Sequence, residues 1–494
     1  MPIQSLNPAN GVLLRSFDPL TAEVLLEKIA LAASAFVEYA NVPLGHRELC
    51  MRKLADLLES ETDELATLIT GEMGKPVLAA RAEIVKCASA CRFYADHAAR
   101  ILAPEPVDIG LNDAYVRWDP LGVVLAVMPW NFPFWQVFRF LAPALMAGNA
   151  GLLKHASNVP QCALAIEKLV RRAGFPRGVF QALLIEASQV EMVLADERVA
   201  AVTVTGSEAA GRAIAAQAGW LIKKSVLELG GSDPFIVMPS ADLDVVADAA
   251  ARARCVNGGQ SCIAAKRFLV ADEIYDDFEA RFVAAMDAMK IGDPNREETE
   301  IGPLATSALL DDLDAQVQAA IAAGGRVLTG GERMLGKGNY YEPTVIADVP
   351  RTCPVYREEI FGPVAMLFRV RNVDEAIALA NDTPFGLGAS VWTRDDEEQR
   401  RFAAELQSGA VFFNAPVASD PRLPFGGIKH SGYGRELSAA GMREFLNAKT
   451  VVIAEPAAFT RLEATPESAA RDILTDGGTI PFRDFLADRT ASTK

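Results

Sequence analysis

The stretch NGGQSC, residues 257–262, ends in a cysteine whose surroundings suggest chemistry. Two glycines precede Cys262 and allow a close backbone approach, and a thiolate on such a loop is a good nucleophile because little steric cover protects it. A metal ligand, one half of a disulfide and a buried structural thiol are the alternatives. The motif alone therefore suggests a nucleophile but does not exclude these alternatives.

Two other stretches supply side chains that a nucleophilic cysteine uses. Glu228, in LELGGSDP, comes at the end of an expected strand, and its leucine neighbours favour a partly desolvated carboxyl of raised pKa that can act as a general base. Asn131, in MPWNFP, lies on a turn between two prolines, and its amide can donate to a developing oxyanion. An idle strand-end glutamate and an ordinary turn asparagine are the structural alternatives.

A second pair of stretches suggests an anion site. VTVTGSEAAG predicts a strand and then a helix start at Gly206, Ser207 and Gly211, a geometry that suits a pyrophosphate. Lys154, in LLKHAS, falls at a strand end from which a cation can reach a ribose or a phosphate, although a surface lysine is the alternative. Neither the G-x-G-x-x-G fingerprint nor a P-loop occurs in these stretches, so the signal is weak by itself.

The elements that must position these residues follow a regular rhythm. Residues 1–100 have mainly helical periodicity, and from about residue 120 short apolar runs alternate with amphipathic helices in both halves of the chain. This β-α-β rhythm predicts an α/β protein with two doubly wound parallel-sheet domains that meet near Gly230 and Gly231. A cleft between such domains is a favoured ligand site.

Composition excludes several functional classes. The 494 residues carry a net charge of -16, which disfavours nucleic acid and anionic membranes as partners. The N-terminus does not resemble a signal peptide, and the apolar runs are shorter than the roughly 20 residues of a membrane span. Seven scattered cysteines favour a reducing compartment, so a cytoplasmic location is expected. Four histidines without a zinc motif, and Cys87 with Cys91 as an isolated pair, predict no metal.

Together the motifs resemble the aldehyde dehydrogenase superfamily. The similarity extends from about residue 7 to residue 453, through EMGKP, PWNFP, GNAGLLKHAS, TGSEAAG, LELGGSDP, GQSC, EEIFGPV, NDTPFGLGAS and FGGIKHSGYGRE. So many motifs in one order make the resemblance highly specific. It implies NAD(P)-dependent oxidation of an aldehyde to a carboxylic acid, through a cysteine thiohemiacetal and a thioester.

The resemblance also implies a role for each matching residue. Cys262 matches the nucleophile, Glu228 the general base and Asn131 the side-chain donor of the oxyanion hole. The positions that match the cofactor site are Trp130, Lys154, Ser157, Gly206, Ser207, Gly211, Leu229, Glu359 and Phe361.

The substrate expectation depends on two residues. Arg139 and Ser419 resemble the pair that binds the distal carboxylate in Sad-type bacterial succinate-semialdehyde dehydrogenases, and guanidinium and carboxylate are well matched in geometry. An arginine satisfied within the helices is the alternative. Those enzymes often have another arginine six residues before the nucleophile, where this chain has Val256, so Arg254 and Arg422 are candidates to replace it.

The cofactor expectation depends on Ser157. NAD-preferring members often have a glutamate at this position, and a neutral serine beside Lys154 should tolerate a 2′-phosphate, so NADP is expected to be accepted or preferred. The main alternative function is a broader-specificity aliphatic or aromatic aldehyde dehydrogenase, and a non-catalytic cofactor-binding relative is more remote.

The resemblance finally implies a division of the chain. A small β flap, with strands in VDIGLNDAYVRWDP and FLNAKTVVIAE, is expected to complete a homodimer or homotetramer. The expected parts are a cofactor-binding domain (1–100 and 120–229), a catalytic domain (230–438), the oligomerisation flap (101–119 and 439–455) and a C-terminal extension (456–494).

Overall fold

The computed structural model describes residues 2–110 and 113–453, so the expected extension at 456–494 lies outside the described residues. Contacts divide the chain into two compact units. Within the described residues, the first comprises 2–102 and 119–447 and contains both large sheets, and the second comprises 103–110, 113–118 and 448–453.

The N-terminal hundred residues are mostly helical, as their periodicity predicts. They begin with an antiparallel pair, β1 (Ile3–Leu6) and β2 (Leu13–Phe17). The helices that follow are α1 (Ala22–Tyr39), α2 (Leu44–Ser60), α3 (Thr62–Met73) and α4 (Val77–Ile101). Leu25, Ile29 and Ala32 recur at helical spacing on α1 and pack on the first large sheet, because they form its apolar face.

The first large sheet has six strands in the order β17-β9-β8-β5-β6-β7, and β17 alone of these runs antiparallel to its neighbour. Its strands are β5 (Val123–Met128), β6 (Ala150–His155), β7 (Phe180–Ala182), β8 (Val199–Thr205), β9 (Lys224–Glu228) and β17 (Gly432–Tyr433). Its helices are α5 (Trp135–Ala147), α6 (Pro160–Arg172), α7 (Val190–Ala195) and α8 (Glu208–Trp220), with a 3₁₀ turn η1 (Ala187–Gln189).

The register of this sheet brings the candidate site residues to one edge. Met128 pairs with His155, and Thr205 pairs with Glu228, so β5, β6, β8 and β9 end at the same level. Asn131 follows β5 and Gly206 follows β8. Because the carboxyl ends of parallel strands form the usual ligand crevice, the sheet itself assembles residues that are distant in sequence.

The second large sheet has seven strands in the order β12-β13-β14-β11-β10-β15-β16, parallel except for β12 at the edge. Its strands are β10 (Pro234–Val237), β11 (Arg267–Ala271), β12 (Arg326–Thr329), β13 (Thr344–Ala347), β14 (Val364–Val370), β15 (Gly388–Trp392) and β16 (Ala410–Phe413). Its helices are α9 (Leu243–Cys255), α10 (Tyr275–Asp287), α11 (Ser307–Ala322), α12 (Val373–Asn381) and α13 (Asp396–Glu405). This part of the chain also contains one further helix, α14 (Ser438–Arg443), and four 3₁₀ turns. The turns are η2 (Val256–Gly259), η3 (Asp272–Ile274), η4 (Pro354–Arg357) and η5 (Lys429–Ser431).

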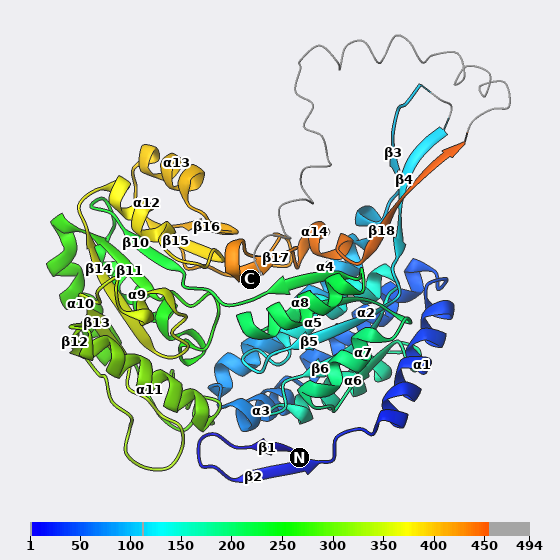
Figure 1. Cartoon of the computed structure of the whole chain (residues 1–494), viewed down its shortest axis with the longest axis horizontal. Helices are drawn as coiled ribbons and strands as arrows, with labels where there is room; N and C mark the ends of the chain where they lie inside the picture. The colour runs from blue at the N-terminus through cyan, green and yellow to red at the C-terminus, as the bar shows by residue number, and fades with distance from the viewer. Residues whose placement is uncertain (1, 111–112, 454–494) are drawn as a thin grey trace, which may run out of the picture. The chain divides into compact units, whose positions relative to one another are not determined.

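Helices cover both faces of this second sheet (Figure 1). Phe235 and Val237 of β10 pack with α9 and α10, whereas Ile236 between them packs with α12 and α13. The alternation follows from the two-residue period of a strand, and a strand buried on both faces is continuously apolar. Two largely parallel sheets covered by helices confirm the predicted fold class.

The second unit contains a three-stranded sheet in the order β18-β4-β3. Its strands are β3 (Glu105–Pro106), β4 (Asp113–Pro120) and β18 (Leu446–Ile453). Strands therefore form in both segments for which the sequence predicts a flap. Within residues 2–110 and 113–453, no helix has the length and apolar character to cross a membrane.

Candidate active site

The loop that carries Cys262 has an unusual backbone. Helix α9 ends at Cys255, and Asn257, Gly258 and Gly259 then adopt positive φ values of 55°, 64° and 76°. A Cβ on Gly259 would lie 2.1 Å from the carbonyl oxygen of Gly362, so only glycine fits there. The glycines of NGGQSC therefore serve the close approach that the sequence suggests.

Cys262 differs from the other cysteines in its exposure. All seven cysteines fall in the described part of the chain and are free thiols, and Cys262 is the partly exposed one among buried neighbours. Burial raises the pKa of the Cys262 thiol to about 12, while the positive charges of Arg139 and Lys266 oppose this shift. The side chain is thus a protonated but accessible thiol at neutral pH, and a disulfide is excluded.

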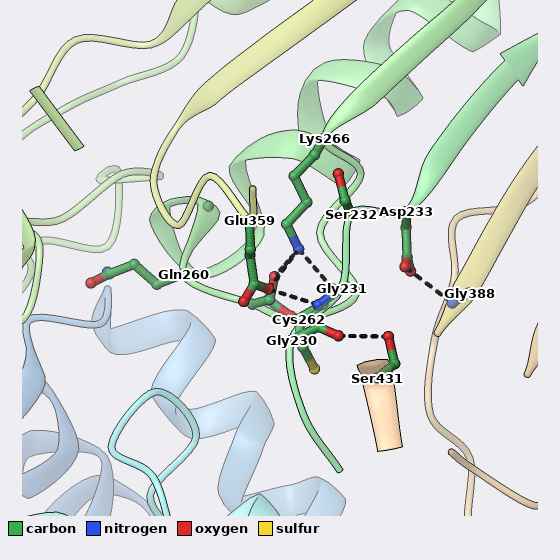
Figure 2. A network of polar contacts seen from close by, with 12 residues as sticks. Gly230, Gly231, Ser232, Asp233, Gln260, Cys262, Lys266, Glu359, Gly388 and Ser431 are labelled. Carbon is green, nitrogen blue, oxygen red and sulfur yellow. Dashed lines mark hydrogen bonds and ion pairs between the residues drawn. The ribbon is translucent and has the colours of Figure 1, made fainter. Parts of the chain in front are cut away.

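Lys266 fixes the backbone of the cysteine loop (Figure 2). Its Nζ donates to the carbonyl oxygens of Ser261 and Cys262, at 2.7 Å each, and lies 3.3 Å from Oε1 of Glu359. The same Glu359 oxygen accepts a hydrogen bond of 3.0 Å from the amide of Gly231. One buried ammonium thus connects the nucleophile loop with a residue expected at the cofactor site.

Asn131 is tied to the same loop. Its side-chain Nδ2 donates to the main-chain carbonyl oxygen of Gln260 at 2.9 Å. Its main-chain carbonyl oxygen accepts from Nδ2 of Asn257 at 2.7 Å. The side chain is 4% exposed. Because an amide nitrogen carries two hydrogens, one donor of Asn131 remains for a ligand oxygen.

Buried groups hold the turn on which Asn131 lies. Oε1 of Glu83 accepts from the amides of Phe134 and Trp135, at 2.9 Å each, and so caps the start of α5. Nδ1 of His155 accepts from the amide of Ala156 at 2.9 Å, which leaves Nε2 to donate to the carbonyl oxygen of Pro133 at 2.8 Å. Burial lowers the pKa of His155 to about 4, so this imidazole is neutral and structural.

Glu228 occupies a buried position at the end of β9. Its side chain is 2% exposed, and a Cβ on Gly426 would lie 2.6 Å from its Oε1, so that glycine leaves room for the carboxyl. Burial and the nearby carboxyl of Glu436 raise the pKa of Glu228 well above its ordinary value, against the charges of Arg139 and Arg435. A buried carboxyl of raised pKa has the basicity that proton abstraction requires.

Two cavities meet at Cys262. One, of about 260 Å³, contains Asn131 and Glu228 in its lining, and the other, of about 310 Å³, contains Arg139 and Ser419. Cys262 and Gln136 line both. The thiol is therefore accessible from two sides, which suits a reaction between two different ligands.

The first cavity gathers most of the expected cofactor residues. These are Trp130, Gly206, Ser207, Leu229, Glu359 and Phe361. The rings of Trp130 and Phe361 meet edge to face, with centroids 5.8 Å apart. Ser207 caps α8 through a hydrogen bond from the amide of Ala210 to its Oγ, so a helix N-terminus opens beside the cavity.

Three expected cofactor residues do not line this cavity. Gly211 has a packing role, since a Cβ there would lie 2.5 Å from the Leu229 side chain. Lys154 is half-buried near the end of β6, and burial lowers its pKa. Ser157 is exposed on the loop beyond β6.

Arg139 and Ser419 both line the second cavity, but Arg139 already has an acidic partner. Its Nε lies 2.6 Å from Oε2 of Glu436, and the two side chains are 3% and 4% exposed. Its guanidinium lies over the Phe425 ring at 4.7 Å, and its Nη2 has no protein hydrogen-bond partner among the described residues. Arg139 is thus paired through its Nε, while the residue lines the second cavity and its Nη2 lacks a partner.

Sequence reasoning missed several residues of the second cavity. Lys86 of α4 and Trp135 of α5 both donate to Oγ of Ser419, at 2.9 and 3.0 Å. Arg252 lines the cavity, whereas Arg254 is fully buried and donates to the carbonyl oxygen of Gly259. Lys86 belongs to no recognisable motif, and only the three-dimensional structure places it next to Ser419.

Arg422 does not supply the additional arginine either. It is exposed and forms an ion pair of 2.7 Å with Asp420, so its guanidinium is engaged beside the cavity rather than in its wall. Across the described ranges 2–110 and 113–453, no three His, Cys, Asp or Glu side chains gather in a way that could hold a metal ion.

The chain belongs to the aldehyde dehydrogenase family, since residues 1–451 match the description "Aldehyde dehydrogenase family". It is 54% identical to the "Succinate-semialdehyde dehydrogenase [NADP(+)] 1" of Mycobacterium tuberculosis over 457 residues, which cover 92% of this chain and 100% of the relative. A "Probable succinate-semialdehyde dehydrogenase [NADP(+)]" of Synechocystis is also 54% identical, with the same coverage of both chains. These similarities confirm the family that the motifs predict.

A solved structure extends the likeness to the fold. The crystal structure of succinic semialdehyde dehydrogenase from Streptococcus pyogenes in complex with NADP+ matches with a TM-score of 0.90 at 37% identity. The match covers 92% of this chain and 100% of that one.

Proposed function

We propose that this protein oxidises succinate semialdehyde to succinate with NADP+ as the preferred hydride acceptor. The observation that carries the proposal is the position of Cys262 at the junction of two cavities, one with the expected cofactor residues and one with cationic side chains. The printed names of the relatives at 54% identity support the same substrate and cofactor. A broader-specificity aldehyde dehydrogenase is the alternative, because the mechanism itself does not require a carboxylate.

The residues around the first cavity fit a dinucleotide. Ser207 and the N-terminus of α8 present backbone amides suited to a pyrophosphate, and Glu359 and Phe361 line the same cavity as Cys262. Lys154 and the neutral Ser157 would take the adenine ribose and its 2′-phosphate, since no carboxylate at position 157 repels it. When bound, the nicotinamide supplies the hydride acceptor.

The chain's own residues then account for the chemistry. The Cys262 thiol loses its proton to solvent, its sulfur attacks the aldehyde carbon so that a C–S bond replaces the S–H bond, and the resulting oxyanion accepts hydrogen bonds from Nδ2 of Asn131 and the amide of Cys262. Loss of hydride from that carbon leaves a thioester on Cys262. Glu228 removes a proton from water, the hydroxide adds to the thioester, and the C–S bond breaks to release the acid.

Arg139 and Ser419 are proposed to face the distal carboxylate of the substrate. The unpartnered Nη2 of Arg139 supports this role, because a buried guanidinium donor without an acceptor is costly and a carboxylate would satisfy it. The first sheet, apart from its edge strand β17, is proposed to belong to a cofactor-binding domain (1–100 and 120–229), and the second sheet to a catalytic domain (230–438).

The second unit is proposed to be the oligomerisation flap of a homodimer or homotetramer, since its three strands form a small sheet whose edge a partner strand could extend. A cytoplasmic location is proposed from the seven free thiols, which suit a reducing compartment.

The test is the formation of NADPH or NADH at 340 nm by the purified protein. Succinate semialdehyde, butanal and benzaldehyde would each be supplied with NAD+ and with NADP+. A kcat/KM for succinate semialdehyde at least about 10-fold above that for butanal, together with a preference for NADP+, is expected. Equal values for the two aldehydes would refute the substrate assignment and favour the broader-specificity alternative.

A further inference from the structure

Lys86 places an ammonium group in the wall of the cavity that leads to Cys262. The residue lies on α4, and its Nζ is 2.9 Å from Oγ of Ser419 and 4.4 Å from the centre of the Trp135 ring. The side chain is half-buried and lines the same cavity as Arg139. Neither the motifs nor the proposed mechanism gives this lysine a role.

The two carboxylates whose charges act on Lys86, those of Glu83 and Asp420, each form their ion pair with another cation. Arg139 is paired with Glu436 at 2.6 Å, and Asp420 is paired with Arg422 at 2.7 Å. Among the described residues, no carboxylate oxygen lies within 4.0 Å of the Lys86 ammonium. A half-buried ammonium without a direct ion-pair partner costs free energy, and an anionic ligand in contact with it would recover part of that cost.

The hydrogen bonds at Ser419 indicate where that anion would lie. Both Lys86 and Trp135 donate to Oγ of Ser419, so its own hydroxyl hydrogen remains free to donate. The free donors on this wall are therefore the remaining N–H groups of Lys86 and the O–H of Ser419, and Arg139, which lines the same cavity, has an unpartnered Nη2 among the described residues. Such a set of donors matches the two oxygens of one carboxylate.

The rest of the cavity suits an aliphatic spacer. Phe132, Ile263 and Phe425 line it together with Cys262, and they offer apolar contacts to methylene groups between a carbonyl at the thiol and a carboxylate at the lysine.

We propose that Lys86 is the specificity-determining cation of the substrate site and binds the distal carboxylate together with the hydroxyl of Ser419. Arg139, whose charge is offset by Glu436, contributes a hydrogen bond to the same carboxylate and holds the Phe425 ring in place in the cavity wall. This inference rests on the proposed function, because it takes a semialdehyde acid as the substrate.

The test compares K86M, K86R and K53M with the unchanged enzyme. K86M keeps the length of the side chain without its charge, and K53M removes an exposed lysine on α2 as a matched control. K86M should raise the KM for succinate semialdehyde about 10- to 100-fold, the range for a hydrogen bond to a charged group, with kcat changed much less. The kcat/KM for butanal should stay within about 2-fold, K86R should restore most of the selectivity, and K53M should change neither value.

A second measurement works without turnover. Calorimetric titration with succinate and with butyrate should show tighter binding of succinate to the unchanged protein and loss of that difference in K86M. Unchanged succinate binding and an unchanged KM in K86M would overturn the role of Lys86, while a persistent preference for succinate semialdehyde would leave the proposed function standing. Equal oxidation of succinate semialdehyde and butanal by the unchanged enzyme would remove both.

Discussion

The Lys266 ammonium lies 3.3 Å from the Glu359 carboxylate while it donates to the backbone carbonyl of Cys262. Lys266 is fully buried, whereas the Glu359 side chain is 21% exposed and lines the first cavity. The contact joins the nucleophile loop to a residue proposed to bind the cofactor ribose. A substitution of Lys266 or of Glu359 should therefore affect both the nucleophile loop and the binding of the cofactor.

The first prediction concerns this pair. Glu359→Gln would leave the buried ammonium of Lys266 without its counter-charge, so the free energy of unfolding should fall by roughly 1–3 kcal/mol. Urea denaturation measures this change, and the KM for NADP+ should rise in the same variant. Glu358→Gln, at the exposed neighbouring position, is the control. An unchanged denaturation midpoint would show that the ion pair contributes nothing to stability.

The second prediction concerns the thiol. Because burial raises the pKa of Cys262 to about 12, alkylation by iodoacetamide should be slow at pH 7 and should accelerate about tenfold per pH unit toward pH 10, since only the thiolate reacts. Mass spectrometry should locate the modification on Cys262 rather than on the six buried cysteines. Cys262→Ala should abolish oxidation, while Cys353→Ala should retain it. Activity that survives in Cys262→Ala would remove the mechanism.

The sequence alone places the strand-end residues at one edge of a sheet but does not specify the residues of the cavity wall, for physical reasons. Glu228 and Asn131 lie in short motifs at the ends of strands, and the register of a parallel sheet brings such positions to one edge. Lys86 meets Ser419 across 333 positions of sequence, through a helix whose pattern is otherwise ordinary. No local signal specifies a contact of that kind.

The arginine expected near the nucleophile shows a second limit. Both Arg252 and Arg254 lie on α9, but residues two apart on a helix point roughly 200° away from each other. The sequence names Arg254 as a candidate, whereas the structure directs Arg254 to the carbonyl of Gly259 and leaves Arg252 in the cavity wall. The helical phase, set by packing of α9 on its sheet, decides between them.

The third prediction separates the two halves of the reaction. Glu228→Gln removes the proposed base for hydrolysis but leaves Cys262 and Asn131, so NADPH should form in a burst of about one equivalent per active site and then nearly stop. Steady-state turnover should fall by about 10²- to 10⁴-fold, the usual range for a general base. Stopped-flow absorbance at 340 nm measures both phases. Exposed Glu64, changed to glutamine, is the control, and full steady-state turnover in Glu228→Gln would assign the base elsewhere.

The fourth prediction addresses the cofactor. Ser157→Glu would place a carboxylate near Lys154, where it repels a 2′-phosphate and can accept hydrogen bonds from ribose hydroxyls. The KM for NADP+ should rise at least about 10-fold, and that for NAD+ should fall or stay unchanged. Ser157→Ala, which adds no charge, should affect both cofactors little. An equal effect of Ser157→Glu on the two cofactors would show that this position does not contact the adenine ribose.

The fifth prediction is a pH dependence of substrate selectivity. Burial, together with the charge of Arg139, lowers the pKa of Lys86 to about 8, against the opposite effects of Cys87, Glu83 and Asp420. The ammonium is therefore present below pH 8 and is lost as the pH rises through that value. Because the carboxylate of the substrate stays ionised throughout, its attraction should weaken on the alkaline side.

The measurement is the ratio of kcat/KM for succinate semialdehyde to that for butanal between pH 6.5 and 10. Taking the ratio cancels the titration of Cys262 and Glu228, which act on both aldehydes alike. The ratio should fall with a midpoint near pH 8 in the unchanged enzyme and should be low and flat in K86M. In K86R it should stay high, because a guanidinium keeps its proton over this range. A ratio that falls equally in K86R would assign the titration to another group than Lys86.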